Sequence, residues 1–417
     1  MSNYSQLEKK VARLLSRFPC IKFFIKKTYQ RLNSILYKKS YVYTCKYRIN
    51  KLSFCGEESF FGYYDKSPIN LSGRYIVFHS VSFSTKKMPE EKKGISIVLY
   101  DRTTKKYKRI DTSLAYNWQQ GSKLMWINDK EFIYNHFDVS RNIYTSKIYN
   151  VVNEKHRVID FPIYDATDTF AISLNFERLN IKRGDYAYRN MNMNIDWSEN
   201  KSDGLFYVDL LENSSKLIMP LSKIIQYNYK ESMENALHKF NHIMISPNKK
   251  KMMFMHRWYL PNGRKFDSLY VSNVDGSNLK LIADDEMVSH CCWKSDNEII
   301  AYLRDRALGD KFYLINIEKE SKVVIGNGNL DAFGDGHPSF YDNKLLFDTY
   351  PNKSRMKELL LYDMQTDILS CLGEFYESMQ YYGETRCDLH PRYVQNGKMI
   401  FIDSVHEARR HLYQIEL

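Results

Sequence analysis

The chain has 417 residues, with 61 Lys or Arg against 49 Asp or Glu and a formal net charge of +12. Residues 1–51 hold 13 of these bases and one acid, so the rest of the chain carries no net charge. A basic protein often binds nucleic acid, but this charge is confined to the N-terminal segment, and we expect no nucleic-acid partner. The seven cysteines are odd in number and contain no C-x-x-C pair, which indicates reduced thiols and a cytoplasmic protein. We expect neither a signal peptide nor a membrane-spanning segment.

The N-terminal segment has the pattern of an amphipathic helix. Apolar residues recur at 3–4 spacing over residues 5–39, and Pro19 marks a kink or the start of a second helix. The sequence therefore predicts a basic helical extension over residues 1–40. Its polar face suits an anionic membrane surface, with the protein peripheral on the inner face of the membrane. Two other interpretations are a helix packed on the main domain with solvated bases, and a mitochondrial presequence.

A unit of about 50 residues recurs along the rest of the chain. Strand-like segments of aromatic and β-branched residues alternate with short turns rich in Asn, Asp, Gly and Pro. Four short antiparallel strands per unit are typical of a propeller blade. We predict an all-β, seven-bladed β-propeller over residues 41–417, with blades at about 57–111, 116–162, 168–220, 239–283, 288–326, 335–373 and 386–417.

The last unit is one strand short. The strand predicted at residues 41–49 is expected to complete this blade and close the ring, which removes exposed sheet edges. The alternative is an irregular stack of sheets.

One histidine recurs in the last four units. His242, His290, His337 and His390 are spaced 48, 47 and 53 residues apart, and each stands four residues before a polar turn. The first strand of every propeller blade lines the central channel, so we expect these imidazoles on one rim. One interpretation is that the four imidazoles form a shared site. The other is that each imidazole is a structural group that hydrogen-bonds the backbone of a neighbouring blade. Asp335 precedes His337 by two residues and should point the same way. Neutral imidazoles with a carboxylate suit a divalent metal, and one imidazole can instead serve as a general base.

Other polar and aromatic residues are expected at the same rim. An Arg there is suited to hold a substrate carboxylate through two hydrogen bonds, although each Arg can equally be a surface residue. The candidate substrate-binding residues are Tyr63, Tyr64, Asp65, Asn241, Arg257, Arg304 and Arg386.

Three stretches resemble the oligogalacturonate lyases, seven-bladed propellers that split acidic oligosaccharides by β-elimination with a bound manganese ion. The stretches are Asn241-His242-Ile243 with Ser246-Pro247, Ser289-His290-Cys291-Cys292-Trp293, and Gly336-His337-Pro338-Ser339-Phe340. The resemblance implies that His242 is the catalytic base and that His290 and His337 are metal ligands. Asp335 stands where that family has a further histidine ligand, and Ala332 lies near the place of its glutamine ligand.

Three functions follow as hypotheses. The first is a metal-assisted lyase of a uronic-acid saccharide, with His242 as base and a metal, manganese by resemblance, on His290, His337, Asp335 and His390. The second is a membrane-surface transferase or modifying enzyme of cell-surface polysaccharide biosynthesis, acting on a lipid-linked glycan. The third is a propeller that binds a glycan or a protein without catalysis, since this fold hosts many functions.

Overall fold

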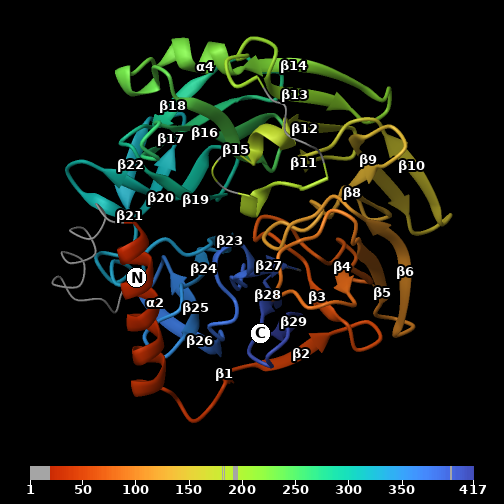
Figure 1. Cartoon of the computed structure of the whole chain (residues 1–417), viewed down its shortest axis with the longest axis vertical. Helices are drawn as coiled ribbons and strands as arrows, with labels where there is room; N and C mark the ends of the chain where they lie inside the picture. The colour runs from red at the N-terminus through yellow and green to blue at the C-terminus, as the bar shows by residue number, and fades with distance from the viewer. Residues whose placement is uncertain (1–18, 181, 183, 191–195, 395–396) are drawn as a thin grey trace.

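Seven β-sheets arranged around a central axis form the body of the structure, a computed structural model (Figure 1). It describes residues 19–180, 182, 184–190, 196–394 and 397–417. Five sheets consist of four consecutive antiparallel strands, and the last two also receive a strand from the N-terminal segment. The predicted seven-bladed β-propeller is confirmed.

The first three blades follow the chain in simple order. Their strands are β3 (Glu58–Phe60), β4 (Tyr75–Val81), β5 (Ile95–Asp101), β6 (Lys106–Ser113), β7 (Met125–Trp126), β8 (Glu131–Asp138), β9 (Ile143–Asn150), β10 (Lys155–Ile159), β11 (Asp165–Ala166), β12 (Phe170–Leu174), β13 (Gly204–Asp209) and β14 (Ser214–Pro220).

The last four blades supply the recurring histidines. Their strands are β15 (Leu237–Ile245), β16 (Lys251–Tyr259), β17 (Lys265–Asn273), β18 (Lys280–Ala283), β19 (Val288–Trp293), β20 (Glu298–Asp305), β21 (Gly309–Asn316), β22 (Ser321–Val324), β23 (Ser339–Tyr341), β24 (Lys344–Asp348), β25 (Met356–Asp363), β26 (Ile368–Tyr376), β27 (Arg392–Val394), β28 (Met399–Ser404) and β29 (His411–Glu416).

Blade-on-blade packing explains why the second strands read as continuous apolar runs. Residues 252–255 of β16 are fully buried, because both faces of the sheet are covered. The polar turn before this strand has Lys249 at φ 62°, and the Lys249 N–H donates to the Ser246 carbonyl at 2.9 Å. Such a turn sets the register between the inner strand, which carries the histidine, and the apolar strand that follows it.

The ring closes differently from the expected single strand at residues 41–49. This segment bends at residues 46–47 and forms two strands. The first, β1 (Tyr43–Cys45), pairs with β26 and becomes a fifth strand of the sixth blade. The second, β2 (Arg48–Leu52), pairs with β29 and completes the seventh blade. The segment passes from one blade to the next, so it cannot remain one straight strand.

The described helices are not part of the seven sheets. The described part of the predicted N-terminal helix is α2 (Pro19–Leu36), which begins at the proline, while residues 5–18 lie outside the described residues. Blade three contains α3 (Phe176–Leu179) and η2 (Gly184–Tyr186). Short helices α4 (Leu221–Tyr227) and η3 (Glu231–Met233) precede blade four, and η4 (Gly383–Thr385) precedes blade seven. Within the described chain, no helix is both long and apolar enough to cross a bilayer.

Candidate active site

The four recurring histidines converge at the centre of the ring. Ring centroids lie 5.9 Å apart for His242 and His290, 4.1 Å for His290 and His337, and 4.3 Å for His337 and His390. None is more than 4% exposed. A shared register in four adjacent blades has therefore produced one buried cluster of imidazoles.

Register shifts and positive φ values mark the backbone at these histidines. The pairing of β15 with β16 shifts register between Asn241 and Met244, and that of β19 with β20 shifts across His290. His242 and His390 have φ values of 51° and 44°, a backbone conformation that residues other than glycine rarely adopt. Such strain persists where the surroundings hold the residue, and it gathers at functional sites.

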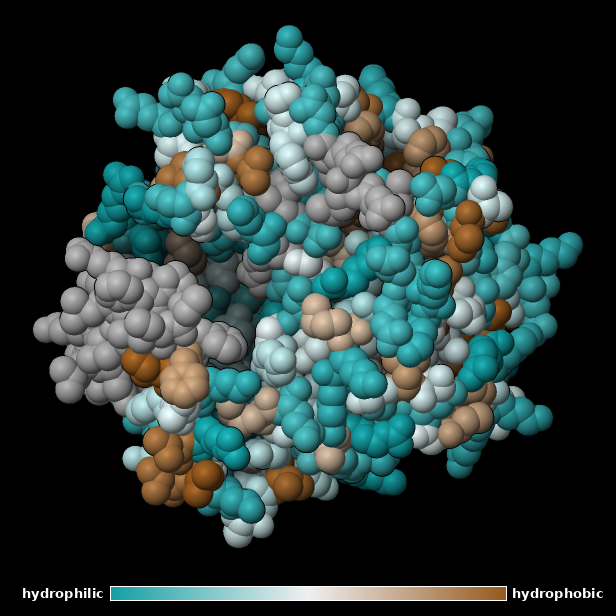
Figure 2. Space-filling view, viewed as in Figure 1, coloured by the Kyte–Doolittle hydropathy of each residue, from teal (hydrophilic) through white to brown (hydrophobic). Residues whose placement is uncertain are grey.

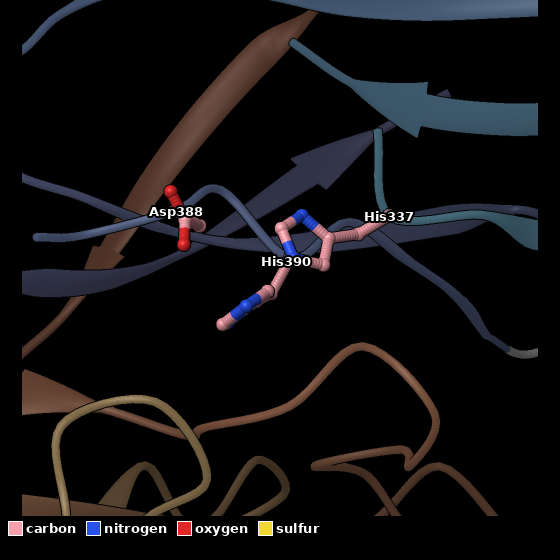
Figure 3. A group of neighbouring side chains, drawn as sticks. All are labelled: His337, Asp388 and His390. Atoms are coloured by element: carbon pink, nitrogen blue, oxygen red, sulfur yellow. The ribbon is translucent and has the colours of Figure 1, made fainter. Parts of the chain in front are cut away.

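Two of the histidines form a candidate metal site with an aspartate (Figure 3). His337, Asp388 and His390 each offer a ligand atom, and these atoms lie within 4.8 Å of one another. His337 lies just before β23, and the other two lie just before β27, so neighbouring blades contribute. The Nε2 atoms of His337 and His390 are buried and have no hydrogen-bond partner among the described residues. Two open imidazole nitrogens and a carboxylate fit a divalent transition metal.

Asp348 at the end of β24 orients both histidines. Its carboxylate accepts the His337 Nδ1–H at 2.9 Å, the His337 backbone N–H at 2.7 Å and the His390 backbone N–H at 3.1 Å. With Nδ1 as the donor, the lone pair of His337 lies on Nε2, the nitrogen available to a metal held with Asp388 and His390. A carboxylate behind a ligand histidine is the usual outer support of metal sites in proteins.

The charges around this group suit metal binding. Burial would raise the pKa of Asp388, but Arg386 and Lys357 hold it well below its usual range. The Arg386 Nε lies 2.7 Å from the carboxylate and the Lys357 Nζ lies 3.5 Å from it. Burial, together with neighbouring positive groups, lowers the pKa of His390 well below its usual value. Asp388 is thus an anion and His390 a neutral imidazole.

Asp335, the carboxylate expected as a ligand, is differently placed. Its side chain accepts a hydrogen bond from the Ser289 hydroxyl at 2.5 Å, and its backbone carbonyl lies 2.8 Å from the His290 Nδ1. Burial raises the pKa of Asp335. Asp335 therefore orients His290 through its backbone, and the carboxylate that joins the histidine group is Asp388.

Tyr63 connects His242 to the rest of the cluster. Its hydroxyl lies 2.5 Å from the His242 Nε2, and its ring centroid lies 5.1 Å from that of His390. Burial, reinforced by neighbouring tyrosines, raises the pKa of Tyr63 well above its usual value. The hydroxyl is therefore protonated and donates to the imidazole. A hydroxyl donor and an imidazole therefore stand together beside the candidate metal ligands.

The remaining rim candidates surround this pair. The Tyr64 hydroxyl donates to the Cys291 carbonyl at 2.9 Å, and its ring centroid lies 5.3 Å from that of His337. Asn241 accepts a hydrogen bond from the Tyr164 hydroxyl at 3.1 Å. Asp65 is buried beside Lys66, whose Nζ lies 3.7 Å from its carboxylate.

A buried lysine lies near His242. The Lys123 Nζ lies 3.9 Å from the centroid of the Tyr164 ring and has no hydrogen-bond partner among the described residues. The Tyr164 hydroxyl accepts the backbone N–H of His242 at 3.1 Å. The site therefore holds an amine one aromatic ring away from His242, and burial lowers the pKa of this amine.

Of the three expected arginines, one lies at the site. Arg386 pairs with Asp388 and, at 3.0 Å, with Asp185. Arg257 is buried in an ion pair with Asp267, and Arg304 pairs with Asp310 on the surface. Both guanidinium groups pair with acids of their own blades, and the expected substrate-binding role of Arg257 and Arg304 stays a prediction.

A segment of blade three covers the cluster. Tyr186 of η2 has its ring centroid 5.7 Å from that of His242 and 5.9 Å from that of Tyr63. Its neighbour Asp185 forms the ion pair with Arg386, so the cover is joined to the segment before blade seven. Tyr186 is 2% exposed and is thus buried together with the histidines.

Asp388 and Asp348 are the functional residues that sequence reasoning missed. Asp388 stands two residues before His390, as Asp335 stands two residues before His337, so the same i, i+2 argument would have found it. Asp348 has no such signal, because the turn between β23 and β24 brings it back to His337.

Solved structures share this architecture. An oligogalacturonate lyase from Vibrio parahaemolyticus aligns with a TM-score of 0.58 and 11% identity over 90% of this chain and 96% of its own. An oligogalacturonate lyase in complex with manganese aligns with a TM-score of 0.60 and 13% identity, over 90% of this chain and 97% of its own. The fold is that of oligogalacturonate lyase. The tricorn protease also aligns, with a TM-score of 0.50 and 11% identity, over 87% of this chain and 34% of its own.

Neither the family models nor the curated protein sequences compared with this chain match it. Propellers of lyases and of a protease both superpose on it, so the likeness establishes the fold. The chemistry must be argued from the site.

Proposed function

We propose that this protein is a metal-assisted lyase that cleaves an acidic, uronic-acid saccharide by β-elimination. One observation carries the proposal: a hydrogen-bonded tyrosine–histidine pair, Tyr63 and His242, stands beside a buried group of metal-ligand type. β-Elimination needs a base for the proton α to a carboxylate and an acid for the departing oxygen. This cluster holds both next to a place for a cation.

His337, His390 and Asp388 would hold the metal, and His290 lies beside them. A bound divalent cation supplies Lewis-acid polarisation of the substrate carboxylate, which acidifies the adjacent C–H. Asp348 keeps the Nε2 of His337 directed at this place. The residues present fit the manganese reported for one of the lyase structures.

The tyrosine–histidine pair performs the proton transfers. His242 takes the proton from the carbon α to the carboxylate, the electron pair forms a carbon–carbon double bond, and the β C–O bond breaks. Tyr63 gives its proton to the departing oxygen. The 2.5 Å contact then returns the proton from the imidazole to the phenolate. Because His242 and Tyr186 are both buried and their rings are in contact, we expect the saccharide to displace Tyr186.

Lys123 places a buried amine near His242. Its Nζ lies against the Tyr164 ring without a hydrogen-bond partner among the described residues. Burial lowers the pKa of this amine, because an unpaired ammonium costs several kcal/mol to bury. An acidic saccharide in the channel would stabilise the charged form of the amine, which favours an acidic saccharide over a neutral one.

The test combines metal analysis with a cleavage assay. Purified protein is titrated with Mn²⁺, and its bound metal is measured by mass spectrometry. Oligogalacturonate and other uronic-acid oligosaccharides are then assayed by the ultraviolet absorbance of the unsaturated product. We expect His337→Ala with His390→Ala to abolish metal binding, and His242→Ala to abolish cleavage with metal retained.

The matched control is His156→Ala, which removes an exposed histidine packed on Tyr149. It should leave both readouts unchanged. Metal binding that survives the double substitution would contradict the assigned ligands. Cleavage that survives His242→Ala would contradict the assigned base, and a protein that cleaves no uronic-acid saccharide with metal bound would contradict the reaction.

A further inference from the structure

Helix α2 exposes an apolar stripe. Phe24, Leu32, Ile35 and Leu36 are 71%, 55%, 66% and 77% exposed. At about 100° per residue, these four positions fall within an arc of about 120° on one side of the helix. Asn33, on the other side, is 7% exposed. The buried side of the helix therefore carries a polar residue, and the large apolar side chains lie on the exposed side, the reverse of an ordinary surface helix.

The charge around the stripe has one sign. Between Glu8 and Glu57 no residue is acidic, and all 13 Lys and Arg of residues 1–51 lie in this interval.

 

On the helix itself, Lys27 and Arg31 lie along one border of the apolar stripe, at about 100° per residue. A partner for this face must accept apolar side chains at its centre and present negative charge at its edge.

The propeller holds this helix at its rim. Lys39, just after α2, forms an ion pair with Glu374 at 2.7 Å, and the Tyr41 hydroxyl donates to the same carboxylate at 2.6 Å. The Lys27 Nζ lies 5.5 Å from the centroid of the Tyr382 ring. Figure 1 shows α2 beside the sixth blade, and Figure 2 shows apolar side chains among hydrophilic ones on that side of the molecule.

We propose that α2 binds the surface of an anionic lipid bilayer, with its apolar stripe between the headgroups and its bases on the phosphates. An interfacial helix needs a one-sided apolar face and basic borders, and this helix has both. Each base near such a surface adds to binding by attraction to anionic lipid. The helix lies in the plane of the surface, because it is not apolar enough to cross a bilayer.

The test is co-sedimentation of the full chain with lipid vesicles. Vesicles of phosphatidylglycerol and phosphatidylcholine are compared with vesicles of phosphatidylcholine alone. We expect binding to the anionic vesicles, weaker binding to the neutral ones, and a decrease as salt is raised, since the Debye length falls from about 10 Å at 0.1 M to about 3 Å at 1 M.

Two variants separate the apolar and the charged contributions. Leu32→Ser with Ile35→Ser and Leu36→Ser should weaken binding about a hundredfold, because the variant buries less apolar surface in the bilayer. Lys27→Gln with Arg31→Gln should weaken it about twentyfold, and only on anionic vesicles.

The matched control removes three exposed apolar side chains elsewhere. Leu71, Val139 and Val152 are 88%, 68% and 69% exposed and lie in loops of the first two blades. Their replacement by Ser should leave vesicle binding unchanged. An equal loss in this control, or no binding of the unsubstituted chain to anionic vesicles, would overturn the proposal. So would a dimer in light scattering that the α2 variant dissociates, because a second copy would then cover the stripe.

Discussion

Replacing Asp348 by Asn should weaken the candidate metal site of His337, Asp388 and His390 while leaving these three residues in place. The carboxylate accepts hydrogen bonds from His337 Nδ1 and from the backbone N–H groups of His337 and His390. Asn keeps the volume but replaces one acceptor oxygen with an NH₂ group, which must face one of these donors. One buried hydrogen bond is lost, and the remaining hydrogen bonds have a neutral acceptor in place of a charged one.

The magnitude follows from these contacts. A hydrogen bond to a charged group contributes about 1.5–3 kcal/mol and a neutral one about 1 kcal/mol. We therefore expect Asp348→Asn to lower the free energy of unfolding of the metal-free protein by about 3 kcal/mol. Loss of the orienting carboxylate should weaken metal binding about 10- to 100-fold.

Urea unfolding of the metal-free protein and calorimetric titration with Mn²⁺ measure the two effects separately. Asp403→Asn is the control, because Asp403 is equally buried and accepts the backbone N–H groups of Phe61 and Gly62 without touching His337 or His390. It should lower stability but not metal affinity. Unchanged affinity in Asp348→Asn, or an equal loss in both variants, would refute the assigned role of Asp348.

Three further outcomes are expected. Tyr63→Phe removes the hydroxyl bonded to His242 and should lower kcat about 10²- to 10⁴-fold with metal binding retained; an unchanged kcat would exclude Tyr63 as the acid. Gly336→Ala places a Cβ 1.8 Å from the Asp348 carbonyl oxygen and should lower the free energy of unfolding by about 1–3 kcal/mol or more, measured in urea. Burial lowers the pKa of His79 to about 3. Below about pH 6.5 this histidine is therefore protonated in the unfolded chain but not in the folded protein. Stability is lost as pH falls from about 6.5 toward 3. His79→Gln should flatten the pH dependence of the unfolding free energy by up to about 1.4 kcal/mol per pH unit, and an unchanged slope in urea unfolding between pH 7 and pH 4.5 would contradict this.

The repeat pattern was sufficient to predict the propeller. Period and turn chemistry are local properties, so the polar turns before β16 and β20 were readable from residues such as Ser246 and Asp296. The common register of His242, His290, His337 and His390 was also local, and in a closed ring of blades it had to place the four side chains around one axis.

Contacts between distant segments could not be predicted in this way. Asp335 and Asp388 each stand two residues before a histidine, and the sequence does not distinguish their environments. In the folded chain Arg386 and Lys357 keep Asp388 ionised, whereas burial raises the pKa of Asp335. The electrostatic surroundings of a carboxylate depend on every element packed against it.

Local patterning thus determined the blades, their number and the ring of imidazoles, because repeated short-range preferences need no knowledge of the partner segments. Tertiary packing decided the rest: that residues 43–45 and 48–52 join different blades, that Tyr63 meets His242, and that Asp388 joins the histidine group. Each of these contacts joins residues whose proximity depends on how the ring closes, and closure is a property of all seven blades together.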